Sequence, residues 1–384
     1  MTQRVALVVE QLRQPVPGGI GTYCRGLLQG LAQLAAQPGG LGGVDLVLVA
    51  SRSPGSPDPL AGWPWPLLPS ALPRRLLGEL WRRGVVGLPA GARSGVVHAT
   101  SLAAPWRAAQ RGAALVVTVH DLAWRQHPEA YPARGRRWHE ASLRHALRRA
   151  QRIVVPSVAV AEQVEAAGAA APVVVVPHGA DHLPPPDEPA TEAWLARAGV
   201  EGPFLLTVGT LEPRKNLGRV LAAFARARAE LGKDLTLVVV GPAGWGRQDW
   251  PPDPREPASA GVVFAGALPG PVLAGLYRRA VALVYAPLAE GFGLPPLEAM
   301  ATGAAVVASP VPSVDEEVAL VVDPLDVAGL AGAMVAVVTD PARRRQLAAA
   351  GRARASTRTW QAVAEAHLAL WRELGATTAN GGVQ

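Results

Sequence analysis

Short runs made mostly of valine, leucine, isoleucine and alanine recur along the sequence, and this rhythm constrains the fold more than any other feature. In the first half the runs are residues 5–9, 44–50, 96–99, 115–119, 153–156 and 173–176. In the second half they are residues 204–208, 235–240, 262–265, 282–285, 304–308 and 319–322. Continuous runs, unlike alternating ones, are typical of strands buried on both faces of a parallel sheet. Because stretches of helical length separate them, the sequence predicts two doubly wound α/β domains.

A proline-rich stretch at 181–189 separates the two series and cannot continue a strand or a helix. We therefore expect an N-terminal domain over 1–182, a linker over 183–200 and a second domain over 201–355. A closing helix over 356–376 is expected to pack back towards the first domain. Its apolar stripe comprises Trp360, Val363, His367, Trp371 and Leu374.

The bulk composition narrows the class of protein. Of the 384 residues, 49% are apolar and 17% charged, which is typical of globular proteins. No apolar run approaches the roughly 18 to 20 residues that span a bilayer. The apolar residues before Glu10 are not numerous enough to form the apolar core of a signal peptide. With Cys24 as the one cysteine, no intramolecular disulfide can form. We expect a cytoplasmic protein.

The net charge of +7 is unevenly distributed. Residues 1–190 hold 19 arginines and 12 acidic residues, whereas the rest of the chain is balanced. The densest clusters comprise Arg74, Arg75, Arg82, Arg83, Arg134, Arg136, Arg137, Arg144, Arg148, Arg149 and Arg152. Trp81 and Trp138 lie beside these arginines in the sequence. Two interpretations of the clusters stay open: a solvated helix surface, or a face that contacts an anionic membrane or a lipid-linked acceptor. Nucleic acid is not an expected partner.

Residues 290–298, which read E-G-F-G-L-P-P-L-E, carry the clearest chemistry. They follow a predicted strand, and Pro295 or Pro296 is expected to open a helix that Gly303 ends. A helix N-terminus offers unpaired N–H donors and partial positive charge, which suit a pyrophosphate. Glu298, expected in the first turn, can accept hydrogen bonds from a ribose diol. Glu290 can reach sugar hydroxyls. Either glutamate alone fits an ordinary structural role equally well.

Arg214 and Lys215 are adjacent cations between another predicted strand and its helix, within the segment T-V-G-T-L-E-P-R-K-N that ends at Asn216. A guanidinium fork and an ammonium at such a turn can bind two phosphates. Lys215 is one of only two lysines in the chain.

Residues 290–298 resemble the signature of the retaining glycosyltransferases of family 4, also called group 1, which have the GT-B fold of two Rossmann-like domains facing across a cleft. The resemblance implies that Glu298 holds the donor ribose and that Glu290 contacts the donor sugar. Phe292, Gly293 and Leu294 are implied to meet the sugar and the phosphates. The segment from Gly209 resembles the G-x-L-x-x-x-K-N element of the family, in which Arg214 and Lys215 neutralise the departing nucleoside diphosphate.

Two segments of the first half resemble further family elements. Gly18 and Gly19 belong to a G-G-I-G turn, which the family places next to the donor diphosphate or the acceptor, before a helix expected near Thr22. His120 belongs to an H-D-L segment and is implied to lie beside the donor sugar. Residues 177–181, P-H-G-A-D, resemble the family's interdomain crossing, where we expect a hinge.

The expected activity is transfer of a hexose from a nucleotide sugar to a glycan or lipid-linked acceptor with retention of configuration. GDP-mannose is the first expected donor, because the motifs look like those of bacterial mannosyltransferases of polysaccharide assembly, and UDP-glucose is the second. No D-x-D motif occurs, so neither a metal nor another cofactor is expected. The segment from Ser313 to Pro324 is shorter than the family pattern, which leaves a catalytically silent donor-binding chain as an alternative.

Overall fold

The computed structural model describes residues 2–53, 55, 58–89, 91–92, 95–109, 112–232, 234–245 and 260–380, the last four of these without side chains. The chain forms two compact units. The first comprises Met1–Leu122, Ala133–His182 and Thr359–Gln384, and the second comprises Ala123–Pro132 and Leu183–Arg358. Each unit is described by itself.

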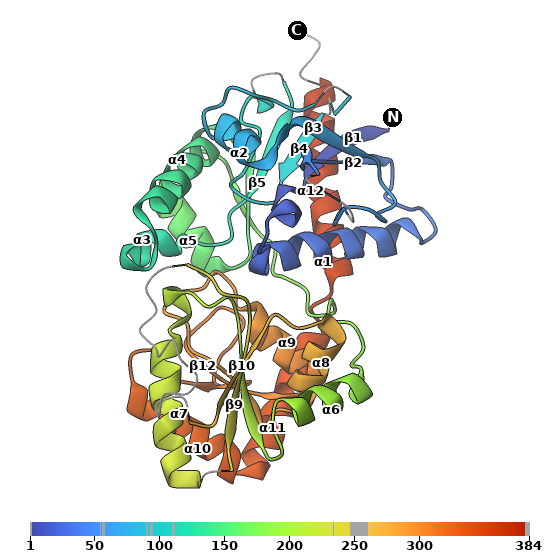
Figure 1. The fold of residues 1–384 in the computed structure, drawn as a ribbon. Helices are drawn as coiled ribbons and strands as arrows, with labels where there is room; N and C mark the ends of the chain where they lie inside the picture. Colours follow the sequence, from blue (N-terminus) through green and yellow to red (C-terminus); the bar gives the residue numbers. More distant parts are fainter. Residues whose placement is uncertain are drawn as a thin grey trace. The chain divides into compact units, whose positions relative to one another are not determined.

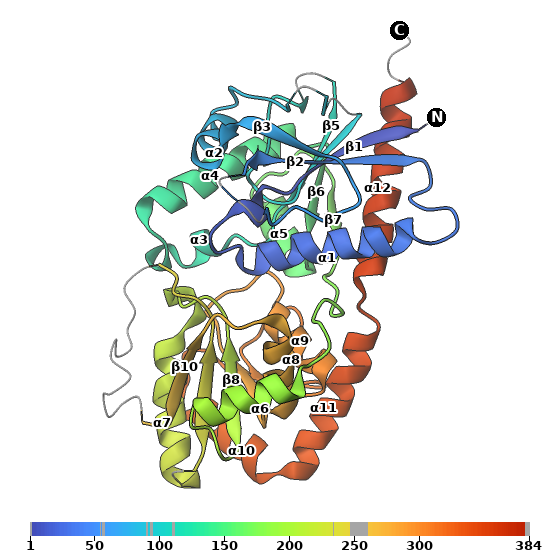
Figure 2. The ribbon, with the colours of Figure 1, turned by 45° about the vertical axis from the view of Figure 1, so that its right-hand side comes forward.

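The first unit contains a parallel sheet of seven strands in the order β3-β2-β1-β4-β5-β6-β7. Figure 1 labels β1 to β5, and Figure 2 labels β6 and β7. The strands are β1 (Gln3–Val8), β2 (Val44–Arg52), β3 (Leu67–Pro73), β4 (Val96–Ala99), β5 (Ala114–Thr118), β6 (Arg152–Val155) and β7 (Val173–Val175). β3 was not predicted. It contains Pro69 and Pro73 and lies at the edge of the sheet, where a residue without an N–H is tolerated.

Helices cover the first sheet and include the closing segment of the chain (Figure 2). They are η1 (Glu10–Arg13), α1 (Gly18–Ala35), α2 (Arg74–Arg82), α4 (Ala133–Arg149), α5 (Val158–Ala166) and α12 (Trp360–Asn380). α12 packs on α1 and contacts β1, β4 and β5. All five residues of its predicted stripe are buried. The Trp360 backbone N–H donates to Asp181 Oδ1 at 2.7 Å, which joins the start of this helix to the end of the 177–181 segment.

The second unit contains a parallel sheet of six strands in the order β10-β9-β8-β11-β12-β13. The strands are β8 (Phe204–Val208), β9 (Thr236–Val240), β10 (Val262–Gly266), β11 (Ala282–Tyr285), β12 (Ala305–Ala308) and β13 (Leu320–Val321). In both units the strand order starts from a central strand, runs outward to one edge and then resumes on the other side. This is the doubly wound topology that the continuous apolar runs predict.

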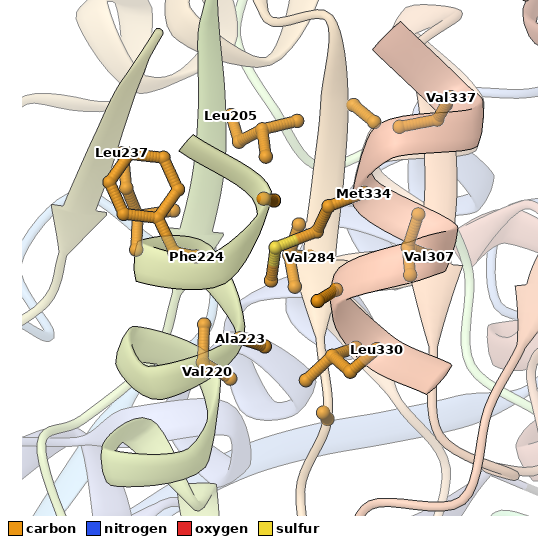
Figure 3. Packing of buried hydrophobic residues seen from close by; sticks show 14 of the residues in the cluster. Leu205, Val220, Ala223, Phe224, Leu237, Val284, Val307, Leu330, Met334 and Val337 are labelled. Atoms are coloured by element: carbon orange, nitrogen blue, oxygen red, sulfur yellow. The ribbon is translucent and has the colours of Figure 1, made fainter. Parts of the chain in front are cut away.

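One face of the second sheet packs against α7 (Leu217–Leu231) and α10 (Val327–Thr339), as Figure 3 shows. Phe224 of α7 and Met334 of α10 are buried there among the side chains of alternate strand residues. Because successive strand residues point to opposite faces, the remaining residues face the other side of the sheet, where α9 (Leu294–Thr302) packs on β11 and β12 and α8 (Gly270–Arg279) packs on α9. The sheet is therefore buried on both faces. α11 (Pro341–Ser356) packs on α9 and β12.

Residues 183–200, expected as a linker, include the helix α6 (Glu188–Arg197). Asp187 caps it by accepting from the Ala190 N–H at 2.9 Å, and Thr191 and Leu195 are buried. α6 packs on α8. The prolines at 184–186 end before the helix, so the extended stretch is much shorter than predicted. The segments α3 (Ala123–Gln126) and η3 (Pro128–Ala130) also belong to the second unit.

Candidate functional site

The strand order of the second sheet reverses between β8 and β11, and the predicted donor-binding segments lie there. β8 pairs in parallel with β11 through Leu205 with Ala282 and Leu206 with Leu283. The chain leaves β8 through Gly209 to reach η4 (Pro213–Lys215), and it leaves β11 to reach Glu290 and α9. In open α/β sheets, ligands bind beyond the carboxyl ends of the strands at such a reversal. The second unit thus brings the two predicted segments together.

Asn216 holds the two segments against each other. It has a left-handed backbone with φ +59°, and its side-chain amide donates to the carbonyl oxygens of Ala286 at 3.0 Å and Pro324 at 2.8 Å. Asparagine tolerates this conformation better than most residues. A backbone hydrogen bond from Leu288 N–H to Arg214 O, at 2.9 Å, adds a further connection.

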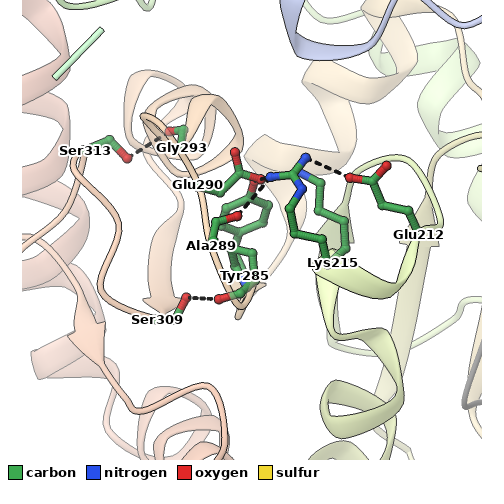
Figure 4. Close-up of polar contacts among 10 residues, drawn as sticks. Glu212, Lys215, Tyr285, Ala289, Glu290, Gly293, Ser309 and Ser313 are labelled. Carbon is green, nitrogen blue, oxygen red and sulfur yellow. Dashed lines mark hydrogen bonds and ion pairs between the residues drawn. The ribbon is translucent and has the colours of Figure 1, made fainter. Parts of the chain in front are cut away.

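Glu290 is the centre of a polar cluster, which Figure 4 shows. Its Oε1 accepts from the Tyr285 hydroxyl at 2.8 Å and pairs with Arg214 Nη1 at 2.8 Å. The Lys215 ammonium also binds Oε1 and donates to the Tyr285 hydroxyl at 3.0 Å. Arg214 Nη2 donates to Glu212 Oε1 at 2.7 Å. Two cations and two carboxylates therefore share one largely buried network.

The network decides the charge state of Glu290. Burial opposes its ionisation, but Arg214 and Lys215 outweigh burial and lower the pKa to about 2. Burial raises the pKa of the Tyr285 hydroxyl well above its ordinary value, and the negative Glu290 adds to this effect. At neutral pH Glu290 is therefore a carboxylate that accepts hydrogen bonds, and Tyr285 is a neutral donor.

We expected Glu298 in the first turn of α9. It lies in the second turn, because the helix already begins at Leu294. It is buried, and its Oε2 accepts from the Tyr277 hydroxyl at 2.7 Å. Pro295 and Pro296 have no N–H, so among the first three helical residues only Leu294 offers a backbone donor. The N-terminus of α9 is thus poorer in donors than the sequence interpretation assumed.

The segment after Ser313 closes onto the glycine turn that precedes α9. Ser313 Oγ donates to Gly293 O at 2.8 Å, and Ser313 N–H donates to Phe292 O at 2.9 Å (Figure 4). Gly293 has φ +98°, and a Cβ added there would lie 2.6 Å from Ser313 Oγ. A glycine is therefore required at this position. The short segment is well anchored on the predicted donor-binding turn.

A small cavity lies beside Lys215, at the carboxyl ends of β8 and β9. Its volume is about 20 Å³, and Gly209, Thr210, Tyr285 and Ala286 are among its lining residues. Gly209 has φ +156°, and a Cβ added to it would lie 3.5 Å from Lys215 Cε. A side chain at Gly209 would therefore narrow the space next to the ammonium.

In the first unit, Gly18 and Gly19 form the first turn of α1, so the helix begins earlier than Thr22, where we expected it. Gly21 N–H donates to Pro17 O at 3.0 Å, which closes this turn. A Cβ on Gly21 would lie 2.2 Å from Pro17 Cβ. The helix can therefore begin at Gly18 because position 21 has no side chain. The helix N-terminus has no side-chain cap and no acidic residue in its first turn. This leaves the backbone donors of the turn as its polar groups.

His120 follows β5 and is half-buried. Its Nε2 lies 2.9 Å from Thr100 O, and because a carbonyl only accepts, Nε2 carries the hydrogen. Burial lowers the pKa of His120, so the ring is neutral. The Tyr23 ring stands edge-on to it, with centroids 4.8 Å apart. Tyr23 was not singled out in the sequence, where it looks like one more apolar residue of α1.

Two interpretations of the basic first half can be compared with the structure. Trp81 is fully buried, so it does not belong to an exposed membrane-binding face. On α4, Arg134, Arg136, Arg137, Arg144 and Arg148 are exposed. Within the described residues no helix is both long and apolar enough to cross a membrane. Nor does any group of three histidine, cysteine, aspartate or glutamate side chains in the described part of the chain have an arrangement suited to a metal ion.

Comparison with known proteins identifies the family. Residues 202–340 match the family described as Glycosyl transferases group 1, and residues 17–182 match Glycosyltransferase Family 4. O-antigen chain mannosyltransferase B from Escherichia coli is 31% identical over 256 residues, which cover 64% of this chain and 67% of that protein.

Solved structures agree on the fold. Sucrose-phosphate synthase from Thermosynechococcus elongatus superposes with a TM-score of 0.72 at 23% identity, over 98% of this chain and all of that one. Anabaena HepE, in complex with UDP-glucose, gives a TM-score of 0.73 at 18% identity, over 96% of this chain and 98% of that one. The predicted GT-B fold is confirmed, and the chain belongs to the family 4 glycosyltransferases.

Proposed function

We propose that this glycosyltransferase transfers a hexose from a nucleotide sugar to a glycan or lipid-linked acceptor, with retention of configuration and without a metal ion. The observation that carries the proposal is the Arg214, Lys215 and Glu290 cluster at the strand reversal of the second sheet. It combines cations for a diphosphate with an ionised carboxylate for sugar hydroxyls. Retention is inferred from family membership.

The proposed chemistry follows from the charges. When the glycosidic bond to the diphosphate breaks, negative charge develops on the departing phosphate, and Arg214 and Lys215 stabilise it. Lys215 has three N–H donors, of which Tyr285 and Glu290 take two. The third has no acceptor among the described residues and can donate to a phosphate oxygen. Glu290, with its pKa of about 2, stays ionised and serves as an acceptor for hydroxyls, not as a general acid.

Further roles are proposed for the other predicted residues. Glu298 accepts from the donor ribose, while Phe292, Gly293 and Leu294 contact the sugar and phosphates. Gly18 and Gly19 offer backbone donors to the diphosphate or the acceptor, and Gly209 leaves room beside Lys215. The neutral His120 accepts a sugar hydroxyl at Nδ1, because Nε2 is committed to Thr100.

GDP-mannose is the proposed donor, because the Escherichia coli relative is named a mannosyltransferase. UDP-glucose is the second candidate, because HepE was solved with it. A thermal-shift panel of GDP, UDP, ADP and dTDP sugars tests the choice, since a ligand that binds only the folded state raises its stability according to affinity. GDP-mannose is expected to give the largest shift. A chain that responds to none of the four contradicts the proposal.

The exposed arginines of α4 are proposed to bind an anionic membrane surface that carries the acceptor. Sedimentation with vesicles of neutral or anionic phospholipid tests this point. We expect binding to anionic vesicles only, and weaker binding after Arg136→Glu and Arg137→Glu. Equal sedimentation of the charge-reversed chain would favour the alternative of a solvated helix surface.

A further inference from the structure

The two carboxylate oxygens of Glu290 have different surroundings. Oε1 accepts hydrogen bonds from the Lys215 ammonium and from the Tyr285 hydroxyl at 2.8 Å, and it forms an ion pair with Arg214 Nη1 at 2.8 Å. Oε2 has no hydrogen-bond partner among the residues that the structure describes, and the shortest contacts of both ion pairs are to Oε1. The side chain remains 13% exposed. One oxygen is thus saturated by the protein, whereas the other is available to a ligand.

Tyr285 has the most rigid side chain of the three residues that contact Oε1. It is the last residue of β11, and it is buried in the sheet. Its side chain has two rotatable bonds before the ring, whereas Arg214 and Lys215 reach Glu290 through long flexible stems. The Tyr285 hydroxyl has a single hydrogen, which it donates to Oε1, and it accepts from Lys215 Nζ at 3.0 Å. Lys215 Nζ also lies 5.3 Å from the Tyr285 ring centroid.

We infer that Tyr285 is a positioning residue, which fixes Glu290 through Oε1 so that Oε2 is presented to the hydroxyls of the donor sugar. The inference rests on the proposed function and goes beyond it by assigning the two oxygens separate tasks. Tyr285 does not touch the donor itself. Its loss leaves Lys215 paired with Glu290, so contacts to the diphosphate persist while contacts to the sugar weaken.

The second unit contains a matched control. The Tyr277 hydroxyl donates to Glu298 Oε2 at 2.7 Å, and Tyr277, like Tyr285, is buried. The proposed ligand of Glu298 is the ribose, which a nucleoside diphosphate retains when the sugar is absent. Tyr→Phe at each position removes one hydroxyl and preserves the ring. The two variants therefore report on the sugar and the nucleotide separately.

Isothermal titration calorimetry on the full chain measures the effect, with GDP and GDP-mannose as one pair of ligands and UDP and UDP-glucose as the other. For Tyr285→Phe we expect the Kd of the nucleotide sugar to rise about three- to tenfold, as for the loss of one hydrogen bond, with the Kd of the nucleoside diphosphate unchanged within about twofold. For Tyr277→Phe we expect both Kd values to rise by the same factor. Thermal unfolding of both variants checks that each is folded.

A double variant tests whether Tyr285 acts through Glu290. In a Glu290→Gln background, Tyr285→Phe is expected to cause no additional sugar-specific loss, because the charged acceptor is already gone. An undiminished loss in that background overturns the inference, as does a Tyr285→Phe variant that weakens both ligands equally or neither. If the unmodified chain binds no nucleotide sugar, the proposed function itself fails and the inference with it.

Discussion

Replacing Glu290 with glutamine isolates the charge of its carboxylate, because the side chain keeps its size. The pKa of Glu290 falls from its ordinary value of 4.5 to about 2. A shift of about 2.5 units, at about 1.4 kcal/mol per unit, corresponds to about 3 kcal/mol. We therefore expect Glu290→Gln to lower the free energy of unfolding of the second unit by about 3 kcal/mol at pH 7. The loss arises because Lys215 remains as a largely buried cation without a carboxylate partner among the described residues, while Arg214 keeps Glu212.

The pH dependence has a definite sign. Because the folded-state pKa lies below the unfolded value, the stabilisation is fully present above pH 4.5 and is lost as the pH falls towards 2. About half of it remains at pH 3. The difference between the unmodified chain and Glu290→Gln should therefore shrink by about half between pH 7 and pH 3.

Native-state hydrogen exchange of the β8 and β11 amides is the appropriate assay, because it reports on the second unit without the first. Glu201→Gln serves as the control, since Glu201 is exposed, and we expect a change within about 0.5 kcal/mol. The reasoning is refuted if Glu290→Gln costs no more than the control at pH 7, or if its cost is the same at pH 3.

Two further predictions concern stability. Gly303 ends α9 with φ +84°, and a Cβ there would lie 1.8 Å from Arg352 Nη2, so Gly303→Ala should cost about 1 kcal/mol or more in chemical denaturation. Gly332 lies inside α10, and a Cβ added there meets no atom within 4 Å, so Gly332→Ala should instead stabilise the chain. A Gly303→Ala variant that is more stable than Gly332→Ala would contradict this account. Burial lowers the pKa of His367 from 6.5 to about 4. The contribution of the neutral ring to the free energy of unfolding is therefore complete above pH 6.5, and about 3 kcal/mol of it is lost as the pH falls to 4. His367→Gln should flatten the stability profile of the first unit in that range, and an unchanged slope would argue against a neutral buried ring.

The strands could be predicted from the sequence because a sheet covered on both faces needs continuous apolar runs. β3 could not, because Pro69 and Pro73 are acceptable only at a sheet edge, and edge position is a property of the whole sheet. The helix α6 was hidden by the prolines that precede it. Its cap, Asp187, was itself part of the proline-rich stretch assigned to the linker.

Some residues of the candidate site could likewise be predicted from the sequence, and others could not. Arg214, Lys215, Glu290 and Glu298 were predicted because they follow predicted buried strands and belong to segments that resemble the family's motifs. Tyr285 was counted only as the end of a strand, because a pattern of apolar residues does not reveal where a hydroxyl points. Its position at the carboxyl end of β11 was the available signal. The same limitation applies to Tyr277, whose hydroxyl reaches Glu298 only when α8 and α9 are packed together.

Sugar transfer by the full chain and by Lys215→Met tests the central claim most directly. The assay follows label from GDP-mannose, and in parallel from UDP-glucose, into a lipid or polysaccharide acceptor fraction. We expect transfer by the unmodified chain and a loss of about a hundredfold or more in Lys215→Met, because one charge that stabilises the departing diphosphate is removed. Equal transfer by the two proteins, or none by the unmodified chain from either donor, would contradict the proposed role of the Arg214, Lys215 and Glu290 cluster.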